Sequence, residues 1–369
     1  MNQRSNRAES SRVAHGGRVY EAARRWGIGP GEVIDFSASI NPLGPPPGVL
    51  SAIENALSPV NLRAYPDSYA FLRALADKQS LMPDEVIVGS GTAALMFAVL
   101  HALLPKRVLV LEPAFAEYSR ACAAVKAEVT TWPLTEEDGF TPNFASLVRA
   151  VKEQLFDLVI LNSPHNPTGI SYRKEELLSL VDAAQAQNVT VLIDEAFVDY
   201  APQASLVSLA GTKPHLVVLR SLTKFYAMPG LRVGYGVCTA KLAAKITEQI
   251  DSWSVSTVVL EAGRAALDED EFGAESRRVN ALAREEFTNA LRGVGLKVFP
   301  SDANFLLARM PHGSGEDLQR WLEAERILIR RCDSFRGLGD AYIRLAVRSC
   351  AENVRLVSLI EEWLKGNQG

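Results

Sequence analysis

The sequence predicts an α/β fold, with a mostly parallel sheet sandwiched by helices and a small α+β domain after it. Short apolar runs typical of buried strands recur along the first ~250 residues and alternate with helical or turn sequence. Three polar candidate residues, Asn166, Asp194 and Lys224, stand about thirty residues apart. That spacing suits successive β-α-β units, which bring strand ends to one edge of a parallel sheet. Beyond about residue 250 the pattern changes to long helices and short paired strands.

The composition is that of an ordinary globular protein. The chain has 369 residues, of which 47% are hydrophobic and 22% charged, enough for two domains and a large core. A net charge of −4 argues against a general nucleic-acid surface. No apolar run reaches the ~18 residues of a membrane helix, and the polar first residues do not form a signal peptide. We therefore expect a cytoplasmic protein with no membrane or nucleic-acid partner.

The cysteines give no sign of a disulfide framework or a metal site. Cys122, Cys238, Cys332 and Cys350 are scattered, without a C-x-x-C pair, and three of them fall in or beside apolar runs. Buried thiols in a reducing compartment are the expected state, and no metal is predicted.

The N-terminal part begins with a short helix and an extended segment. A glycine turn, His15-Gly16-Gly17, precedes a helix that stops at Gly27. Residues 33–44 (V-I-D-F-S-A-S-I-N-P-L-G) then form an extended piece that breaks into a proline-rich turn. On its residues alone, His15 would be taken as structural.

The next segment places a helix start after a glycine turn. Residues 48–58 are expected to be helical, and a loop with Tyr65 before Pro-Asp follows. Residues 85–95 (E-V-I-V-G-S-G-T-A-A-L) read as strand, turn and helix start, so the backbone N–H groups of Thr92 and Ala93 form a natural phosphate seat. Many α/β turns look alike, and the dinucleotide fingerprint is absent because no third glycine or following acid fits.

Further strand ends carry three candidate site residues. The apolar runs that predict these strands lie at residues 108–111, 157–161 and 189–193. Phe115 is either part of the hydrophobic core or an aromatic side chain that stacks on a planar ring. Asn166 is either part of a turn without further function or an amide donor to a phenolate oxygen. Asp194 closes an apolar strand, where an unpaired carboxylate would be costly; a protonated ring nitrogen would satisfy it.

The stretch from Ser221 to Tyr235 (S-L-T-K-F-Y-A-M-P-G-L-R-V-G-Y) is the most specific motif. It follows the apolar run 215–220 and supplies two hydroxyls, a lysine and an arginine. A lysine forms a Schiff base with an aldehyde only as the neutral amine, so Lys224 requires a site that lowers its pKa. Ser221, Thr223 and Arg232 can donate hydrogen bonds to a phosphate. S-x-x-K alone would indicate only a surface loop.

The C-terminal part is expected to be α+β. The predicted elements are a helical region at 255–293, strands near 296–300 and 303–307, a helix near 315–325, paired strands at 327–331 and 341–347, and a terminal helix at 351–365. The paired strands carry Arg330 and Arg344. Their neighbours Arg331 and Arg348 fit the usual edge or surface placement of a strand arginine.

Together these motifs resemble fold-type I pyridoxal-phosphate (PLP) enzymes, in the branch of histidinol-phosphate aminotransferases and threonine-phosphate decarboxylases. The resemblance covers about residues 13–365 and depends most on the lysine stretch and on the N-x-P-x-N-P-T-G string that begins at Asn162. It implies a large domain at 46–255 with a mostly parallel seven-stranded sheet and a small α+β domain at 256–369. It also implies an N-terminal arm, 1–45, over the active site.

The resemblance implies PLP as cofactor, with Lys224 and Asp194 as catalytic residues. Lys224 carries the cofactor, Asp194 pairs with its ring nitrogen and Phe115 stacks on its ring. The other implied cofactor-binding residues are Gly91, Thr92, Ala93, Asn166, Ser221, Thr223, Arg232 and, from the other subunit of a homodimer, Tyr65. Many aminotransferases carry a tyrosine where this chain has Phe197, so one hydrogen bond to the cofactor O3′ is lost, which disfavours transamination.

The H-G-G opening and the D-F-S-A-x-I-N-P-L-G string are similar to threonine-phosphate decarboxylases in particular. The implied substrate-binding residues are His15, Ser39, Asn41, Asn166, Arg330 and Arg344. Ser39 stands where that family usually has Asn, which weakens one contact to the substrate phosphate. Two arginines and a histidine suit a small phosphorylated amino acid with two anionic groups.

Three functions remain open at this point. The first is decarboxylation of L-threonine O-3-phosphate to (R)-1-amino-2-propanol O-2-phosphate in cobalamin biosynthesis. The second is histidinol-phosphate aminotransfer with 2-oxoglutarate. The third is a PLP-binding regulatory domain without catalysis, which we do not expect, because no DNA-binding segment is evident before residue 15 or after the last helix.

Overall fold

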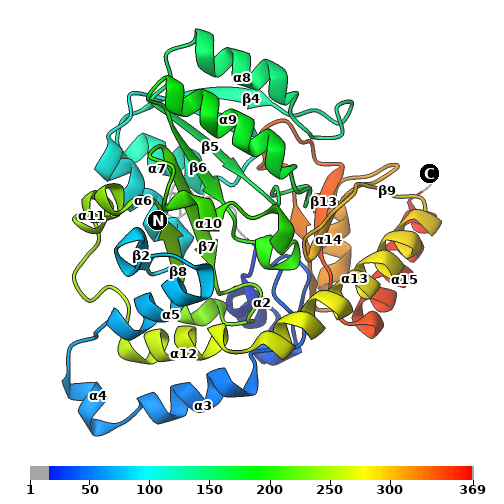
Figure 1. The fold of residues 1–369 in the computed structure, drawn as a ribbon. Helices are drawn as coiled ribbons and strands as arrows, with labels where there is room; N and C mark the ends of the chain where they lie inside the picture. Colours follow the sequence, from blue (N-terminus) through cyan, green and yellow to red (C-terminus); the bar gives the residue numbers. More distant parts are fainter. Residues whose placement is uncertain (1–15, 368–369) are drawn as a thin grey trace, which may run out of the picture.

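The computed structural model describes residues 16–367, which contain a large sheet, a smaller sheet and surrounding helices (Figure 1). The strands of the large sheet, in spatial order, are β2 (Val86–Gly89), β8 (Gly234–Val237), β7 (Leu216–Ser221), β6 (Thr190–Asp194), β5 (Leu158–Asn162), β3 (Arg107–Glu112) and β4 (Glu128–Pro133). Within this sheet only β8 runs against its neighbours. The predicted seven-stranded, mostly parallel sheet is confirmed.

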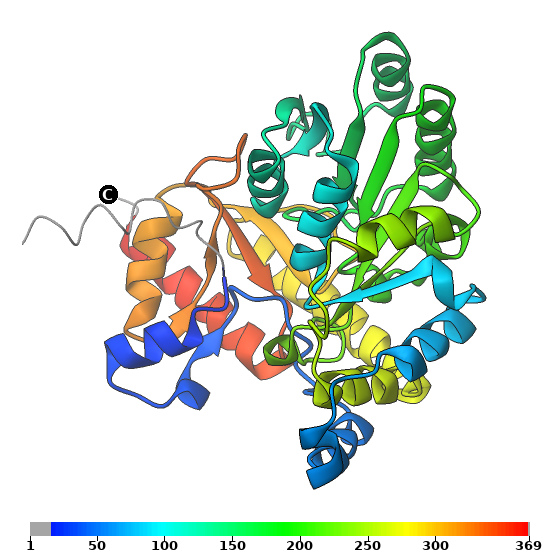
Figure 2. The ribbon, with the colours of Figure 1, turned by 90° about the vertical axis from the view of Figure 1, so that its left-hand side faces the viewer.

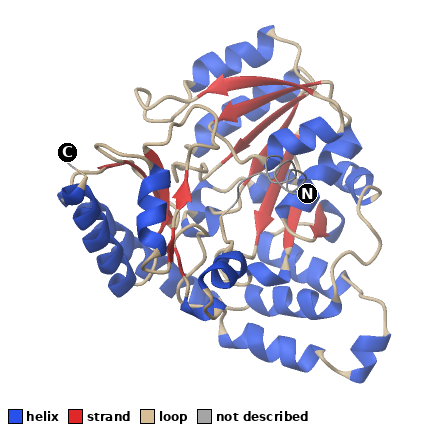
Figure 3. Ribbon diagram, turned by 180° about the vertical axis from the view of Figure 1, so that it is seen from behind, coloured by secondary structure: helices blue, strands red, loops and turns tan. Residues whose placement is uncertain are grey.

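Helices cover both faces of the large sheet (Figure 3). One face is packed by α6 (Thr92–Leu103), α7 (Glu117–Ala124) and α11 (Ala240–Thr247), and the other by α5 (Tyr69–Gln79), α8 (Phe144–Glu153), α9 (Lys174–Ala186), α10 (Val207–Ala210) and α12 (Thr257–Leu267). Alternation along β5 explains the two layers, since Leu158 and Ile160 belong to one hydrophobic cluster and Val159 and Leu161 to the other. Strands buried on both faces need the continuous apolar runs seen in the sequence.

The strand order brings the candidate residues to one edge. Asp194 and Ser221 end the parallel strands β6 and β7. Because β8 is antiparallel to both neighbours, β2 points the same way as β7, and the register aligns Gly89 and Ser221 with Gly234 between them. The start of α6 at Thr92 therefore lies beside the end of β7, as predicted for a phosphate seat at this edge.

The smaller sheet builds a second core. Its strands, in spatial order, are β12 (Arg330–Arg331), β13 (Tyr342–Ala346), β10 (Phe305–Arg309) and β9 (Lys297–Val298), all antiparallel. It packs against α13 (Asp270–Gly293), α14 (Gly315–Glu323) and α15 (Cys350–Gly366). The predicted small α+β domain is confirmed, while its boundary at residue 256 and the arm boundary at residue 45 stay predictions.

The paired strands differ from their prediction in one respect. Residues 327–331 do not form one strand along 341–347: only β12 pairs with β13, and β11 (Ile327–Leu328) pairs in parallel with β1 (Ile34–Asp35). Figure 2 shows the blue N-terminal segment, with α2 (Val19–Trp26), beside the orange and red C-terminal elements. The N-terminal part of the chain thus completes the small domain.

Two other findings complete the fold. The helical region 255–293 is two helices, α12 and α13, and the helices α3 (Pro47–Ala56) and α4 (Pro59–Arg63) extend from the body of the molecule (Figure 1). The elements that the pattern did not predict are α4, α5, α7, α8, α10, α11 and β4.

The remaining structural observations concern thiols, metals and membranes. Cys122, Cys238 and Cys332 are buried, Cys350 is exposed, and all four are free. Within residues 16–367 no group of side chains suited to a metal ion is found. None of the helices in that range combines the length and apolarity needed to cross a bilayer.

Candidate active site

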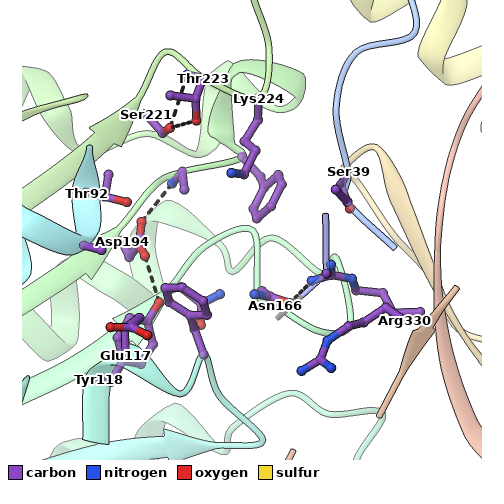
Figure 4. A pocket seen from close by; sticks show the side chains of 18 of the residues that line it. Ser39, Thr92, Glu117, Tyr118, Asn166, Asp194, Ser221, Thr223, Lys224 and Arg330 are labelled. Atoms are coloured by element: carbon purple, nitrogen blue, oxygen red, sulfur yellow. Dashed lines mark hydrogen bonds between the residues drawn. The ribbon is translucent and has the colours of Figure 1, made fainter. Parts of the chain in front are cut away.

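A cavity of about 440 Å³ lies at the C-terminal edge of the parallel strands, between the large and small sheets. Among its lining residues are Ser39, Thr92, Ala93, Phe115, Asn166, Asp194, Ser221, Thr223, Lys224, Arg232, Arg330 and Arg344. Figure 4 shows Lys224 facing the interior, with Asp194 and the Ser221–Thr223 pair on one side and Arg330 and Ser39 on the other. The structure thus brings most of the predicted site residues together.

One end of the cavity is built to hold a phosphate. The Oγ atoms of Ser221 and Thr223 lie 2.7 Å apart, at the end of β7. Opposite them α6 begins at Thr92, where backbone N–H groups have no helical acceptor. Gly91 caps this helix with φ +88°, and a Cβ atom there would lie 2.8 Å from Nη2 of Arg232. Hydroxyls, a helix N-terminus and a guanidinium therefore converge on one small volume.

Lys224 lies in the middle of the cavity with its pKa strongly lowered. Burial, reinforced by the charges of Arg232 and Arg344, lowers the pKa of Lys224 to about 8, although Asp194 acts in the opposite direction. A lysine with this pKa provides a substantial fraction of neutral amine near neutral pH. That is the requirement stated for a lysine that reacts with an aldehyde.

Asp194 forms the end of the cavity on the far side from the small domain. The hydroxyl of Tyr118 donates to its Oδ2 at 2.9 Å, and the N–H of Ala196 donates to its Oδ1 at 3.1 Å. Burial raises the pKa of Asp194 to about 6, against the hydrogen bonds from Tyr118 and Ala196 and the charge of Lys224. Each oxygen keeps a lone pair for a further donor, such as a ring N–H.

Asn166 and Arg344 are joined across the two domains. Nη1 of Arg344 donates to Oδ1 of Asn166 at 2.6 Å, and Nη2 donates to the carbonyl of Ser37 at 2.9 Å. With its oxygen occupied, Asn166 has its amide N–H groups to offer a ligand. Burial and the charge of Arg330 lower the pKa of Arg344 to about 10, and its Nε has no hydrogen-bond partner among the described residues.

The second anion-binding group is Arg330. Nη2 of Arg330 donates to Ser334 at 2.8 Å, and its guanidinium lies 5.0 Å from the ring centre of Phe335, which also lines the cavity. Ser39 is 2% exposed, and its hydroxyl lacks a partner within the described part of the chain. A buried hydroxyl without a partner is costly, so a ligand oxygen at this end would satisfy it.

Three predicted site residues, Gly91, Asn41 and Tyr65, do not line the cavity. Gly91 does not line the cavity itself but allows Arg232 to approach. Asn41 does not line it either: its Nδ2 donates to Phe225 and Ser276, both at 2.8 Å, and its Oδ1 accepts from Leu43.

The third of these residues is Tyr65. Tyr65 is 75% exposed and stacks on Trp253 with ring centres 4.2 Å apart, away from the cavity of this chain. His15 lies outside the described residues.

Several lining residues were not predicted from the sequence, namely Tyr118, Glu117, Arg120, Ser37, Asn162 and Phe335. Tyr118 had a detectable signal, since it stands one helical turn after Phe115 in a segment that follows a strand. Phe335 had none, because it belongs to a loop of the small domain whose approach to the cavity depends on tertiary packing.

The residues present fit pyridoxal 5′-phosphate. The phosphate end offers hydrogen-bond donors on three sides. Lys224 has the lowered pKa that a lysine needs to react with an aldehyde. Asp194 lies opposite, with a free lone pair on each oxygen. Phe115 lines the wall between these groups, where a ring would pass. Ser39 Oγ and Arg344 Nε, which have no hydrogen-bond partner in residues 16–367, remain for a second, anionic molecule.

Comparisons with known proteins agree with this arrangement. Residues 31–360 match the family model described as aminotransferase class I and II. The chain is 38% identical over 362 residues to the threonine-phosphate decarboxylase of Salmonella typhimurium, an alignment covering 96% of this chain and 97% of that protein.

Two solved structures are similar in fold. The histidinol-phosphate aminotransferase from Clostridium acetobutylicum superposes with a TM-score of 0.84 at 29% identity, covering 90% of this chain and 100% of that one. The L-threonine-O-3-phosphate decarboxylase from Porphyromonas gingivalis has a TM-score of 0.80 at 25% identity, with the same coverage of 90% and 100%.

Proposed function

The chain belongs to the aminotransferase class I and II family, and from that premise we propose that it decarboxylates L-threonine O-3-phosphate to (R)-1-amino-2-propanol O-2-phosphate. The family uses pyridoxal 5′-phosphate, so the protein is a PLP enzyme. The proposed step belongs to cobalamin biosynthesis. Its main support is the pair of arginines that line the cavity, Arg330 and Arg344. Arg330 lies on the side of the cavity away from Asp194 (Figure 4).

The two arginines suit a substrate with two anionic groups. Arg344 is buried and held by Asn166 and Ser37, so its position is defined before substrate arrives. A guanidinium in such a place binds a carboxylate in a fork. Arg330 lies nearer the loop of Phe335 and, with the Ser39 hydroxyl, is placed to bind the phosphate. This assignment gives each anionic group of threonine phosphate a cationic partner.

This binding mode gives Arg344, Lys224 and Asp194 different roles in the reaction. When bound, the cofactor supplies an electron-withdrawing ring that accepts the electron pair of a broken Cα bond. Arg344 would hold the substrate carboxylate and so orient the bond between Cα and that carboxylate for cleavage. Loss of CO₂ would leave the electron pair of the broken bond at Cα, and Lys224 would donate a proton from its Nζ to that carbon. Asp194 would accept a hydrogen bond from the protonated ring nitrogen.

A second function uses the same residues. In histidinol-phosphate aminotransfer, the Cα–H bond would be broken and Lys224 would take that proton. The fold similarity to the aminotransferase from Clostridium acetobutylicum supports this alternative. Phe197, packed on Phe305 with ring centres 4.9 Å apart, speaks against it, since a tyrosine there would offer an additional hydrogen bond to the cofactor.

The assay that separates the two functions uses PLP-loaded protein and L-threonine phosphate. We expect equimolar release of CO₂ and aminopropanol phosphate without added 2-oxoglutarate. Absence of CO₂ together with conversion of histidinol phosphate in the presence of 2-oxoglutarate would establish the aminotransferase instead. An Arg344→Lys variant should lose most decarboxylation while retaining bound PLP, because a lysine cannot replace the fork.

We further propose a homodimer in which Tyr65 reaches the cofactor phosphate of the other subunit. Tyr65 lies among exposed apolar side chains on and around α3 and α4, and exposed apolar clusters mark interfaces. The members of this group are Leu50, Leu57, Val60, Leu62 and Tyr69. Of the elements that carry them, α3 and α4 extend from the body of the molecule (Figure 1).

Light scattering tests the dimer. Leu62→Glu should give monomers and weaken PLP binding. Leu155→Glu, an equally exposed leucine beyond α8, should leave the dimer intact. A wild-type protein that is monomeric at micromolar concentration would refute the proposal.

A further inference from the structure

Tyr118 occupies an unusual place in the site, because among the described residues no other side chain donates a hydrogen bond to Asp194. It stands in the first turn of α7 and is 1% exposed, and its hydroxyl points at the carboxylate (Figure 4). The other donor to Asp194, the N–H of Ala196, belongs to the backbone two residues further along. Of the two groups that donate to Asp194, only the Tyr118 hydroxyl belongs to a side chain.

From this geometry we propose that Tyr118 is a positioning residue that holds Asp194 ionised and turned toward the ring nitrogen of the cofactor. The inference depends on the cofactor and not on the proposed substrate. Tyr118 was not among the site residues predicted from the sequence.

The hydrogen bond between Tyr118 and Asp194 has one direction, from the hydroxyl to the carboxylate. Burial, followed by the charge of Asp194, raises the pKa of the Tyr118 hydroxyl well above its ordinary value of 10. The hydroxyl therefore remains protonated at all working pH values and acts as a donor. Its proton stabilises the carboxylate form of Asp194 and not the neutral acid.

The Tyr118 hydroxyl also affects the protonation of Asp194. Burial raises the pKa of Asp194 to about 6 even with the hydrogen bonds from Tyr118 and Ala196 and the nearby charge of Lys224. Loss of a hydrogen bond to the charged form shifts the equilibrium toward the neutral acid by roughly tenfold or more. Without the hydroxyl, a large part of Asp194 would be neutral near pH 7, and a neutral acid cannot hold a ring nitrogen protonated.

The packing of Tyr118 contributes to the orientation of the Asp194 carboxylate. The ring of Tyr118 meets the ring of Phe115 edge to face, with centres 5.8 Å apart and planes at 86°. Phe115 lines the cavity wall, so one packed pair connects the ring-facing aromatic with the carboxylate. The titratable groups that act on Tyr118 besides Asp194 are Glu112 and Tyr172, and Lys224 is the charged group that acts on Asp194.

The test compares Tyr118→Phe with Tyr172→Phe. Both variants keep a buried ring and lose one hydroxyl, but the Tyr172 hydroxyl has no partner among the described residues and does not bond to Asp194. The holoenzymes are dialysed to equilibrium from pH 5 to 9, and bound PLP is measured by its absorbance. For Tyr118→Phe we expect about tenfold weaker PLP binding at pH 7.5, and a loss of binding on acidification that begins about one pH unit higher than in the wild type.

A purely structural role would give a different result. Weaker PLP binding with an unchanged pH profile, or an equal effect of Tyr172→Phe, would overturn the proposal. An Asp194→Asn background provides an independent check, because its carboxamide has no acid to protonate. In that background Tyr118→Phe should change PLP binding by less than about twofold, whereas a similar tenfold loss would refute the coupling.

Discussion

Lys224 shows how much a single buried residue depends on its surroundings. Its charged form is opposed by burial and by two arginines, which brings its pKa from 10.5 to about 8. At pH 7.5 roughly a quarter of such lysines are neutral, compared with about one in a thousand at the ordinary pKa. The site therefore supplies a reactive amine near neutral pH.

The pKa of Lys224 predicts a pH profile for uptake of the cofactor. The rate at which apo-protein captures PLP should rise with pH and level off above about 8, because only the neutral amine attacks the aldehyde. Stopped-flow absorbance measures this rate. A rate that continues to rise beyond pH 9 would contradict the lowered pKa, and Lys224→Ala should show no covalent capture.

At the residue scale, the sequence predicted chemistry well when one local string contained it. Ser221, Thr223, Lys224 and Arg232 lie in one stretch, and the structure brings them to one cavity. Residue function was not predictable when it depended on partners elsewhere in the chain. Asn41, for example, has the expected polarity, but its amide bonds to Phe225 and Ser276.

Among the elements, α6 depends on the glycine that precedes it. Gly91 has φ +88° and ψ 166°, a region that is essentially limited to glycine. It also gives the Arg232 side chain room beside the start of the helix. One backbone position thus serves both the helix start and the arginine.

Gly91→Ala should therefore weaken PLP binding at least tenfold, because the new Cβ both strains the turn and displaces the guanidinium of Arg232. Equilibrium dialysis measures PLP binding, and urea unfolding measures stability. Gly337→Ala is the matched control, since Gly337 has the same φ of +88° but a Cβ atom at that position would meet no other atom within 4 Å. If both substitutions weaken PLP binding equally, the close approach to Arg232 does not matter.

Elements were predictable in proportion to the length and regularity of their apolar patterns. The buried strands β5, β6 and β7 were all predicted within about a residue of their observed ends. Strand β4 was not, since its partly exposed residues lack a continuous apolar run. The split between β11 and β12 could not be predicted because the partner of β11 is the distant strand β1.

On the scale of the whole molecule, Glu136 joins the two sheets away from the active site. Lys297 donates to Glu136 at 2.5 Å, the Tyr342 hydroxyl also donates to it, and Arg309 lies 3.4 Å away. Burial alone would raise the pKa of Glu136, but the bonds from Lys297 and Tyr342 and the two cationic charges lower it on balance. One carboxylate of the large domain thus binds three groups of the small domain.

Glu136→Gln should lower the free energy of unfolding by about 1–2 kcal/mol, since single exposed pairs contribute little but a shared carboxylate loses several partners. Urea unfolding measures this, and the difference should shrink in high salt. Glu137→Gln is the control, because Glu137 is exposed and forms no ion pair within the described chain. Equal losses in both variants would exclude the proposed role of Glu136.

The lowered pKa of Glu136 also sets a direction with pH. A group whose pKa is depressed on folding contributes stability above its unfolded pKa, here 4.5, and loses it as the pH falls through the folded value. The difference between Glu136→Gln and the wild type should thus be largest near neutral pH and vanish in acid. An unchanged difference at pH 3 would contradict the assignment.

The parallel pairing of β1 with β11 has a consequence for the order of events during synthesis. Roughly 290 residues separate Ile34 from Ile327, so a ribosome working at about 5–20 residues per second completes the second strand some 15–60 seconds after the first. The last strand of the large sheet ends at Val237, so all strands of that sheet are synthesised about 90 residues before β11. During synthesis, β1 therefore remains without its partner strand β11 until the C-terminal part of the chain is made. Arg330 and Arg344, which line the cavity, follow β11 in the chain, so the cavity is completed only after both strands have been synthesised.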